Sequence, residues 1–356
     1  MSGMMRSEKL LRVQLLRGIA AIVVTFGHAQ GWGVKIDSEF SRLNFEFGIG
    51  VDIFFLISGF IMIFTSQHLF GSAGSCVQFL KRRIVRIAPL YWIFTLLMIT
   101  ALFFTPSQVS ASGVTIWEAI RSFLFIPYQA ADNDIQPIFQ LGWTLNYEFF
   151  FYVVFACFLF LPQNLAVVSL SATMVFFVLI GMSLDLSFSA PLTFWTNPII
   201  LEFVAGVWVG LLFLKTGRKD SRILCAFLII MSGLSYALLQ SEEYFRIIKL
   251  GIPAFFVFIG LVFYLPASIE RKISGFSSLS GDTSYSLYLS HPFTLSIVQI
   301  LWDRFGPDTG YTWAYVVLAT AISFLVGVAV YFVIEKPVLR VIRNLNFAGK
   351  ITSHAS

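Results

Sequence analysis

Long apolar runs, separated by short polar stretches, dominate the chain. A run of about 18 residues or more is long enough to cross a bilayer as a helix, and ten such runs can be counted. They cover residues 12–31, 45–66, 87–105, 140–161, 164–184, 197–214, 222–239, 249–267, 283–303 and 312–334. The pattern therefore predicts an all-α, polytopic membrane protein with about ten transmembrane helices.

Lysine and arginine gather at alternate ends of these runs. If the N-terminus is cytoplasmic, seventeen of them fall on the inside and six on the outside. An excess of positive charge on the cytoplasmic side is the usual orientation signal, so we expect both termini in the cytoplasm. The chain shows no repeat and no second domain. We expect a single integral-membrane domain over residues 1–345 and a short polar cytoplasmic tail over 346–356.

Composition supports the membrane class. The chain is 57% hydrophobic and 12% charged, against about 25% charged in soluble domains. The net charge of +5 does not indicate nucleic-acid binding. The lysines and arginines lie at the ends of apolar runs, where they set the orientation in the membrane. Three cysteines within or beside apolar runs do not predict a disulfide framework. A signal peptide is the alternative reading of the first run, but Arg17 interrupts its apolar core and no small-residue cleavage pattern follows His28.

The connection at about 106–139 is the longest one on the predicted outer side. The aromatic and apolar spacing from Ile116 to Tyr128 suggests a short interfacial helix, which the polar AADND stretch follows. Such a helix could help to close a pocket on the outer side. A simple surface loop explains the stretch equally well.

Two ionisable residues stand inside the first apolar run. A charge at the bilayer centre costs roughly 2.5–3.5 kcal/mol, so Arg17 and His28 are candidates for function. They are eleven residues apart, which places them on one helix face and about 16 Å apart along the axis. One stripe of this helix thus carries a cation near one membrane surface and a titratable base toward the other.

The predicted topology brings two carboxylates to the level of His28. Asp52 and Glu148 each lie about two turns into an inward-running helix, in the outer third of the membrane. A histidine beside a carboxylate can act as a general base, so His28, Glu148 and Asp52 are the catalytic candidates. His291 in the ninth run is a fourth polar candidate. For each residue the alternative is an interhelical hydrogen bond that only stabilises the bundle.

A basic segment, FLKRRIVRIAPLYW, precedes the third run. The orientation rule alone would explain its charges. However, Arg83 and Arg86 have the i, i+3 spacing that suits gripping a polyphosphate, and Arg17 enters the bilayer from the same predicted face. The three arginines would hold a large anion, and an elongated molecule must connect it to His28. The histidines and cysteines show no metal-ligand spacing, so no metal site is predicted.

At this point the motifs resemble those of the integral-membrane acyltransferase family 3, and the likeness spans nearly the whole chain. LLRGIAAIVVTFGH carries the family's arginine, ten residues, then histidine. Five further motifs follow in the family's order: GVDIFFLISGF, RRIVRIAPLYW, LGWTLNYEFFFY with Asn146 where many members have serine, SYSLYLSHP, and EKP at Glu335–Pro337. The exopolysaccharide-production O-acetyltransferase branch is the most similar one.

The resemblance implies a bacterial inner-membrane enzyme that moves an acetyl or other short acyl group from cytoplasmic acyl-CoA to a saccharide hydroxyl. Acetyl-CoA is then a donor substrate, no cofactor is bound permanently, and the partners are the donor, the saccharide acceptor and membrane lipids. His28 serves as general base or acyl acceptor; Arg17, Arg83 and Arg86 bind the donor. The expected acceptor-binding residues are Trp143, Asn146, Tyr147 and His291. A saccharide or lipid transporter and a non-catalytic partner in polysaccharide assembly are the alternatives.

Overall fold

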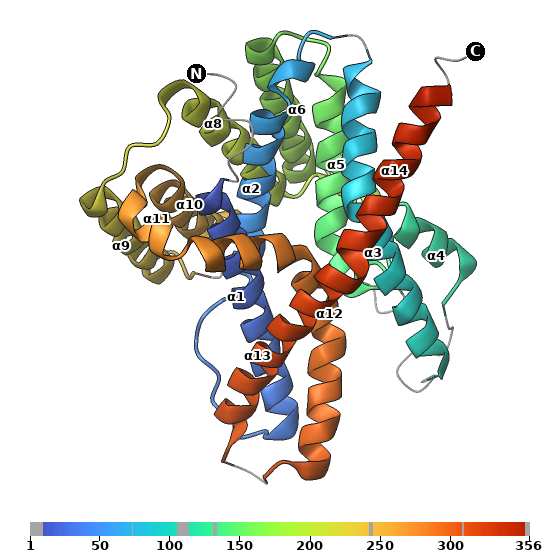
Figure 1. The fold of residues 1–356 in the computed structure, drawn as a ribbon, viewed down its shortest axis with the longest axis vertical. Coiled ribbons are helices and arrows are strands. Elements are labelled where there is room, and N and C mark those ends of the chain that lie inside the picture. Colours follow the sequence, from blue (N-terminus) through green and yellow to red (C-terminus); the bar gives the residue numbers. More distant parts are fainter. Residues whose placement is uncertain are drawn as a thin grey trace. The chain divides into compact units, whose positions relative to one another are not determined.

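The computed structural model describes residues 10–72, 74–104, 114–130, 134–241, 245–307 and 310–352, of which 345–352 are described by their backbone alone. Most of the described chain is helical, and an isolated bridge between Gln129 and Ile135 is the β-type pairing within the described residues. Figure 1 traces the helices in chain order. The predicted all-α class is therefore confirmed.

The chain divides into two compact units, and the first consists of Met1–Ile61 with Ala205–Tyr331. Its helices are α1 (Leu11–Ile36), most of α2 (Ile49–Thr65), most of α8 (Leu201–Thr216), α9 (Arg222–Leu238), the π-helix η6 (Ile247–Gly251), α10 (Ile252–Tyr264), α11 (Ala267–Lys272), α12 (Ser274–Phe305) and α13 (Thr312–Val330).

The second unit consists of Met62–Val204 with Phe332–Ser356. Its main helices are α3 (Ser75–Phe104), α4 (Ile116–Phe123), α5 (Trp143–Cys157), α6 (Gln163–Ser183), α7 (Ala190–Trp195), most of the π-helix η7 (Tyr331–Glu335) and α14 (Lys336–Thr352). Short 3-10 turns lie at Gln67–Leu69, Gln140–Gly142 and Pro198–Ile200. This division into compact units does not test the prediction of a single domain over residues 1–345. Residues 353–356 of the predicted tail lie outside the described residues.

The membrane prediction can be compared with helix length. Each of the ten predicted runs contains a helix. Within the part of the chain that the structure describes, six helical stretches are long and apolar enough to cross a bilayer, and α2 and α9 are shorter apolar helices. The six are Leu11–Ile36, Ser75–Phe104, Gln163–Ser183, Pro198–Thr216, Ile247–Tyr264 and Thr312–Asn344. A multi-pass membrane protein is supported, while the count of ten and the orientation of the termini stay predictions.

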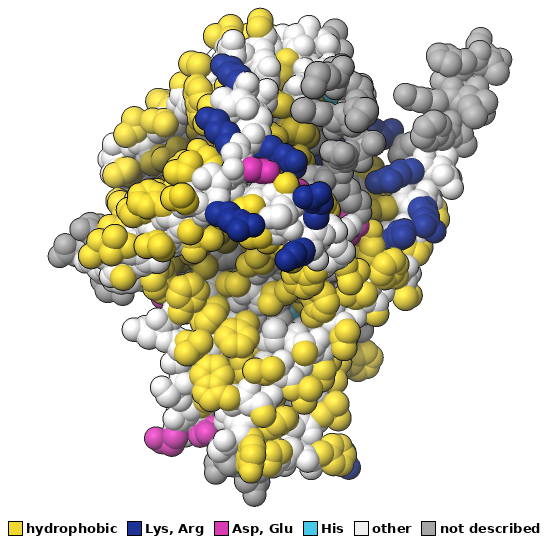
Figure 2. Space-filling view, turned by 60° about the vertical axis from the view of Figure 1, so that its left-hand side comes forward, with side chains coloured by type: hydrophobic (Ala, Val, Ile, Leu, Met, Phe, Trp, Pro, Cys, Tyr) yellow, Lys and Arg dark blue, Asp and Glu magenta, His cyan; other side chains and the backbone are white. Residues whose placement is uncertain are grey.

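The surface is suited to lipid. Large hydrophobic side chains stand far out of the protein, such as Phe103 at 79% exposed and Ile223 at 82%. Figure 2 shows hydrophobic side chains over much of one face, with most of the lysine and arginine in the upper half of the view. Soluble monomers rarely expose large contiguous apolar patches, so this surface agrees with a place in the hydrocarbon region.

The predicted interfacial segment contains a helix, α4. Thr115 accepts a hydrogen bond from the Glu118 backbone amide, and the Glu118 carboxylate accepts one from the Thr115 amide in return. This reciprocal capping satisfies two backbone donors at the helix start. The predicted short helix is therefore confirmed. Ile116 and Trp117 are exposed on α4 and make an apolar surface, and the position of this helix at the membrane interface stays a prediction.

Unit 1 is organised around α1, which packs most extensively against α12. The two helices approach so closely that a Cβ on Gly18 would stand 2.2 Å from the Ser280 hydroxyl oxygen, and a Cβ on Gly281 would stand 2.5 Å from the Cβ of Gln14. Small residues at such a contact let helix backbones pack tightly inside a membrane. Any larger residue at Gly18 or Gly281 would separate the helices.

An ion-pair cluster fixes the beginning of α1. The Arg12 side chain is buried and donates hydrogen bonds to the carbonyls of Val262 and Phe263, at 3.2 and 3.0 Å, and to Glu270 at 3.1 Å. It also donates to Asp220, and this bond holds the pKa of the Asp220 carboxyl below its usual value. Arg12 therefore ties the start of α1 to the connection before α9, to the end of α10 and to α11.

Candidate active site

His28 lies on α1 within unit 1 and is exposed, although Ala29 and Gln30 beside it are buried. Its Nδ1 is 2.7 Å from Nε2 of His291 on α12. The two rings stack with centroids 5.0 Å apart and planes 23° apart. The structure therefore joins two of the predicted site residues, which are 263 positions apart in the sequence.

His291 forms the buried half of this pair and is 0% exposed. Its other ring nitrogen, Nδ1, is 3.2 Å from the carbonyl oxygen of Leu287, one turn earlier on α12. The next residue is Pro292, inside the helix. Proline has no N–H and its ring displaces the carbonyl four residues before it, which bends a helix. The bend of α12 is visible in Figure 1.

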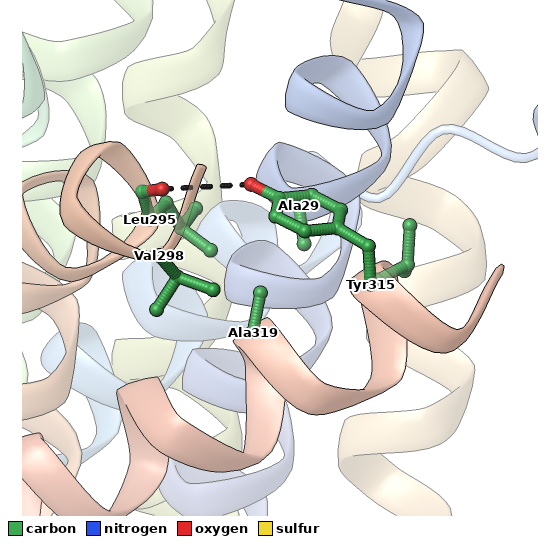
Figure 3. Close-up of a cluster of buried hydrophobic side chains, with 6 residues drawn as sticks. Ala29, Leu295, Val298, Tyr315 and Ala319 are labelled. Atoms are coloured by element: carbon green, nitrogen blue, oxygen red, sulfur yellow. Dashed lines mark hydrogen bonds between the residues drawn. The ribbon is translucent and has the colours of Figure 1, made fainter. Parts of the chain in front are cut away.

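An apolar cluster lies directly after the two histidines on both helices. It contains Ala29 of α1, Leu295 and Val298 of α12, and Tyr315 and Ala319 of α13. Figure 3 shows these side chains converging, with the Tyr315 hydroxyl donating to the carbonyl of Leu295 at 3.5 Å. The close packing restricts how far α1 and α12 can shift, and so supports the spacing of the imidazoles.

Asp52 on α2 is fully buried, and Arg246 donates to it at 2.7 Å. The same Arg246 nitrogen donates to the Gly48 carbonyl at 3.0 Å. Within unit 1, His28 shares a hydrogen bond with His291, and Asp52 forms an ion pair with Arg246. The proposal that Asp52 orients His28 stays a prediction, and sequence reasoning missed Arg246, which it counted only as an outer-loop charge.

Arg17 is half-buried on α1 and donates to Gln14 at 3.1 Å. Gln14 in turn donates to Asp282 of α12 at 2.9 Å. The contact between α1 and α12 thus carries the histidine pair toward one end and the hydrogen bonds of Gln14 toward the other. Arg17 belongs to unit 1 and the predicted Arg83 and Arg86 belong to unit 2, so their grouping around one anion stays a prediction.

Arg83 on α3 lies among aromatic rings of unit 2. It donates to the Thr65 hydroxyl at 2.8 Å, and its guanidinium carbon is 5.3 Å from the ring centre of Phe79 and 5.9 Å from that of Tyr152. The Tyr152 hydroxyl donates to Glu148, one turn earlier on α5. Tyr152 therefore connects Glu148 with Arg83, although helix levels alone predicted these residues near opposite membrane surfaces.

Arg86 is exposed on the next turn of α3. It lines a narrow crevice together with Pro89, Leu90 and Ile93 of α3 and with Glu335, Val338 and Leu339 of η7 and α14. Glu335 is buried at 8% exposed. Two motifs that were recognised separately in the sequence, RRIVRIAPLYW and EKP, therefore meet in unit 2 at this crevice.

The predicted acceptor-binding residues on α5 differ in how open they are. Tyr147 is buried and one face of its ring stacks on Phe194, with centroids 3.8 Å apart, while Trp143 meets Tyr147 edge-on and is half-buried. Asn146 is 1% exposed, and neither polar atom of its side chain has a partner among the described residues.

The hydroxyl of Ser290, which precedes His291, is also buried without a described partner. Buried polar groups are nearly always hydrogen-bonded. Asn146 and Ser290 are thus among the buried polar side chains of the described residues that have a hydrogen bond left to offer to a ligand.

Comparison with known proteins agrees with the motifs. The acyltransferase domain model of acyltransferase family 3 matches residues 10–332. The exopolysaccharide production protein ExoZ of Rhizobium meliloti (strain 1021) is 34% identical over 295 residues, which cover 82% of this chain and 89% of that protein. No solved structure matches the chain. The chain belongs to the integral-membrane acyltransferase family 3.

Proposed function

We propose that the protein is a membrane O-acyltransferase that moves an acetyl or another short acyl group from cytoplasmic acyl-CoA to a hydroxyl of a saccharide. Membership of the acyltransferase family supports group transfer, and the similarity to an exopolysaccharide production protein supports a polysaccharide repeat unit as the acceptor. The observation that carries the proposal is the exposed imidazole of His28, held at 2.7 Å by the buried His291.

In this reaction His28 takes the proton of the acceptor hydroxyl. The hydroxyl oxygen attacks the thioester carbonyl, the new C–O bond forms, the C–S bond breaks, and the proton passes to the departing thiolate. In the alternative route His28 first accepts the acyl group and then passes it to the hydroxyl. Either role is typical of an accessible imidazole. Glu148 and Asp52 stay the predicted carboxylates of the site.

The donor would lie along α1. Arg17, Arg83 and Arg86 hold the phosphates of acyl-CoA through charge-assisted hydrogen bonds, and the pantetheine arm reaches toward His28 over the distance of about 16 Å along the helix. This arrangement requires the N-terminal end of α1 to face the cytoplasm, which is the orientation predicted from the lysine and arginine distribution for a protein of the bacterial inner membrane.

The acceptor would bind near α5. Trp143 is only half-buried and offers a ring face for stacking on a sugar, whereas Tyr147 supports it from behind. Asn146 has free amide groups that can hydrogen-bond sugar hydroxyls or the developing oxyanion. One well-placed donor to such an oxyanion lowers the activation free energy by about 3 kcal/mol.

The test is acyl transfer by the purified protein, from radiolabelled acetyl-CoA to a lipid-linked oligosaccharide. We expect His28→Ala to lower the rate by a factor of about 10² to 10⁴. His68→Ala is the matched control, because His68 contacts Arg82 at 3.3 Å in unit 2 and has no proposed part in the reaction. Transfer at the wild-type rate by His28→Ala, in correctly inserted protein, would refute the role of His28.

A further inference from the structure

We infer that His291 is a positioning residue: it holds His28 in the tautomer that has its proton on Nδ1 and its lone pair on Nε2. The reacting atom of the site is then Nε2 of His28. This inference rests on the proposed function. It adds which ring nitrogen of each histidine carries a proton and which one accepts a hydrogen bond.

The hydrogen-bond network assigns the protons. The carbonyl oxygen of Leu287 can only accept, so the facing Nδ1 of His291, at 3.2 Å, must carry a proton. In a neutral imidazole the other nitrogen is then an acceptor. Nε2 of His291 therefore accepts from Nδ1 of His28, at 2.7 Å, and the proton of a neutral His28 is committed to that bond.

Burial decides against the opposite arrangement. A doubly protonated His291 would donate to His28 and leave it with a proton on Nε2, which could not act as a base. That state places a full charge on a side chain that is 0% exposed, and a buried charge is costly unless it is paired. The neutral chain from Leu287 to His291 to His28 is the favoured one.

Geometry supports the same direction on the substrate side. His28 is exposed while His291 is fully buried, so one imidazole faces possible substrates and the other stands behind it. Among the described residues, Nε2 of His28 makes no hydrogen bond, while Nδ1 of the same ring bonds to His291 and the two rings stack. A lone pair that is free and accessible is what a hydroxyl proton or a thioester carbonyl requires.

The role of His291 in the step follows from charge. When Nε2 of His28 takes the hydroxyl proton, the ring becomes an imidazolium and its Nδ1–H is a stronger donor. The hydrogen bond to His291 becomes charge-assisted, and such bonds are about twice as strong as neutral ones. His291 thus stabilises the transition state without touching the substrate. The same Nε2 of His28 then passes the hydroxyl proton to the departing thiolate.

The kinetic test replaces His291 by a ring without an acceptor and by an amide with one. We expect His291→Phe to lower kcat at least about 100-fold, with KM for acetyl-CoA unchanged within about twofold because donor binding is not affected. His291→Gln offers an amide oxygen to Nδ1 of His28, so it should recover at least about tenfold of that loss. Equal losses in both variants, with equally lowered thermal unfolding midpoints, would indicate a packing role and overturn the inference.

The second test does not depend on activity. Labelling with ¹⁵N-histidine gives few signals, since the chain has four histidines, and the His28 signal is the one lost in His28→Gln. We expect ring-nitrogen spectra with a protonated Nδ1 and an unprotonated Nε2 for both histidines, with Nε2 of His291 accepting the hydrogen bond from Nδ1 of His28. A proton on Nε2 of His28 would overturn the inference, whether or not the protein transfers acyl groups. The expected tautomers in a protein without transferase activity would support the assignment and refute the proposed function instead.

Discussion

The ion pair between Asp52 and Arg246 can be tested by removing the arginine. The test shows whether the buried carboxylate of Asp52 stabilises unit 1 through this pair. The change is Arg246→Met, which keeps most of the side-chain volume and removes the charge. At 2.7 Å and an effective dielectric constant of about 20, the pair attraction is about 6 kcal/mol. Arg246 is 37% exposed, so water screens part of this energy.

Removing one partner of a buried pair typically costs about 3–5 kcal/mol. Because Arg246 is partly exposed, we expect about 3 kcal/mol, which is roughly a hundredfold in the equilibrium constant for unfolding. The assay is the thermal unfolding midpoint of purified protein in detergent. Arg304→Met is the control, because Arg304 is an exposed residue of the same unit and should change stability by less than about 0.5 kcal/mol. An equal effect of the two changes would show that the pair does not stabilise unit 1.

The double variant Asp52→Asn/Arg246→Met separates structure from catalysis. If the carboxylate serves only to bind Arg246, the double variant should be more stable than the sum of the single changes predicts, and its acyl transfer should rise above that of Arg246→Met. If Asp52 acts on His28 or on the substrate, transfer stays as low as in Asp52→Asn. A double-mutant cycle measures the pair energy directly.

Two further predictions concern the packing of unit 1. Arg12→Met should destabilise the protein by about 3 kcal/mol because it strips a buried cluster of its cation, whereas Arg218→Met, whose side chain is 55% exposed, should cost less than about 1 kcal/mol. Since Arg12 lowers the pKa of Asp220, the stabilisation from Asp220 is complete above the ordinary carboxyl pKa of about 4 and is lost as the pH falls through the lowered value. Thermal midpoints measured from about pH 7 to pH 3 should therefore fall less in Arg12→Met than in the wild type; parallel curves would contradict this linkage. Ala29→Leu should overpack the cluster of Figure 3 and cost about 1–3 kcal/mol, while the same residue at the exposed Val317 of α13 should cost almost nothing; equal midpoints for the two variants would show that the cluster can expand.

Much of the fold follows from local pattern. Each predicted apolar run contains a helix, and the short helix expected from Ile116 onward is α4 with its capping residues in place. These features depend on neighbours within a few turns, so a single sequence carries the signal. The level of Glu148 depended on the assumed start of its helix, and its link to Arg83 through Tyr152 was not predicted.

Partners of the buried polar groups could not be predicted in the same way. The sequence shows that Asp52 and His28 need partners, but each had several at a similar predicted depth. Their observed partners are Arg246, 194 positions from Asp52, and His291, 263 positions from His28. Such pairs depend on which helix faces meet, and a bend such as that at Pro292 changes the faces without changing the hydrophobic pattern. The motif SYSLYLSHP marked His291 as notable but did not indicate its contact.

The distance in sequence between the two histidines sets an order of events during synthesis. α1 leaves the ribosome first, and α12 follows only after most of the chain has been made. At about 5–20 residues per second, the 263 positions between His28 and His291 correspond to roughly 15–50 s. During that time His28 stands in the membrane without its partner. If the tautomer depends on His291, a nascent or truncated chain that has not reached α12 carries an imidazole that is not yet set for transfer.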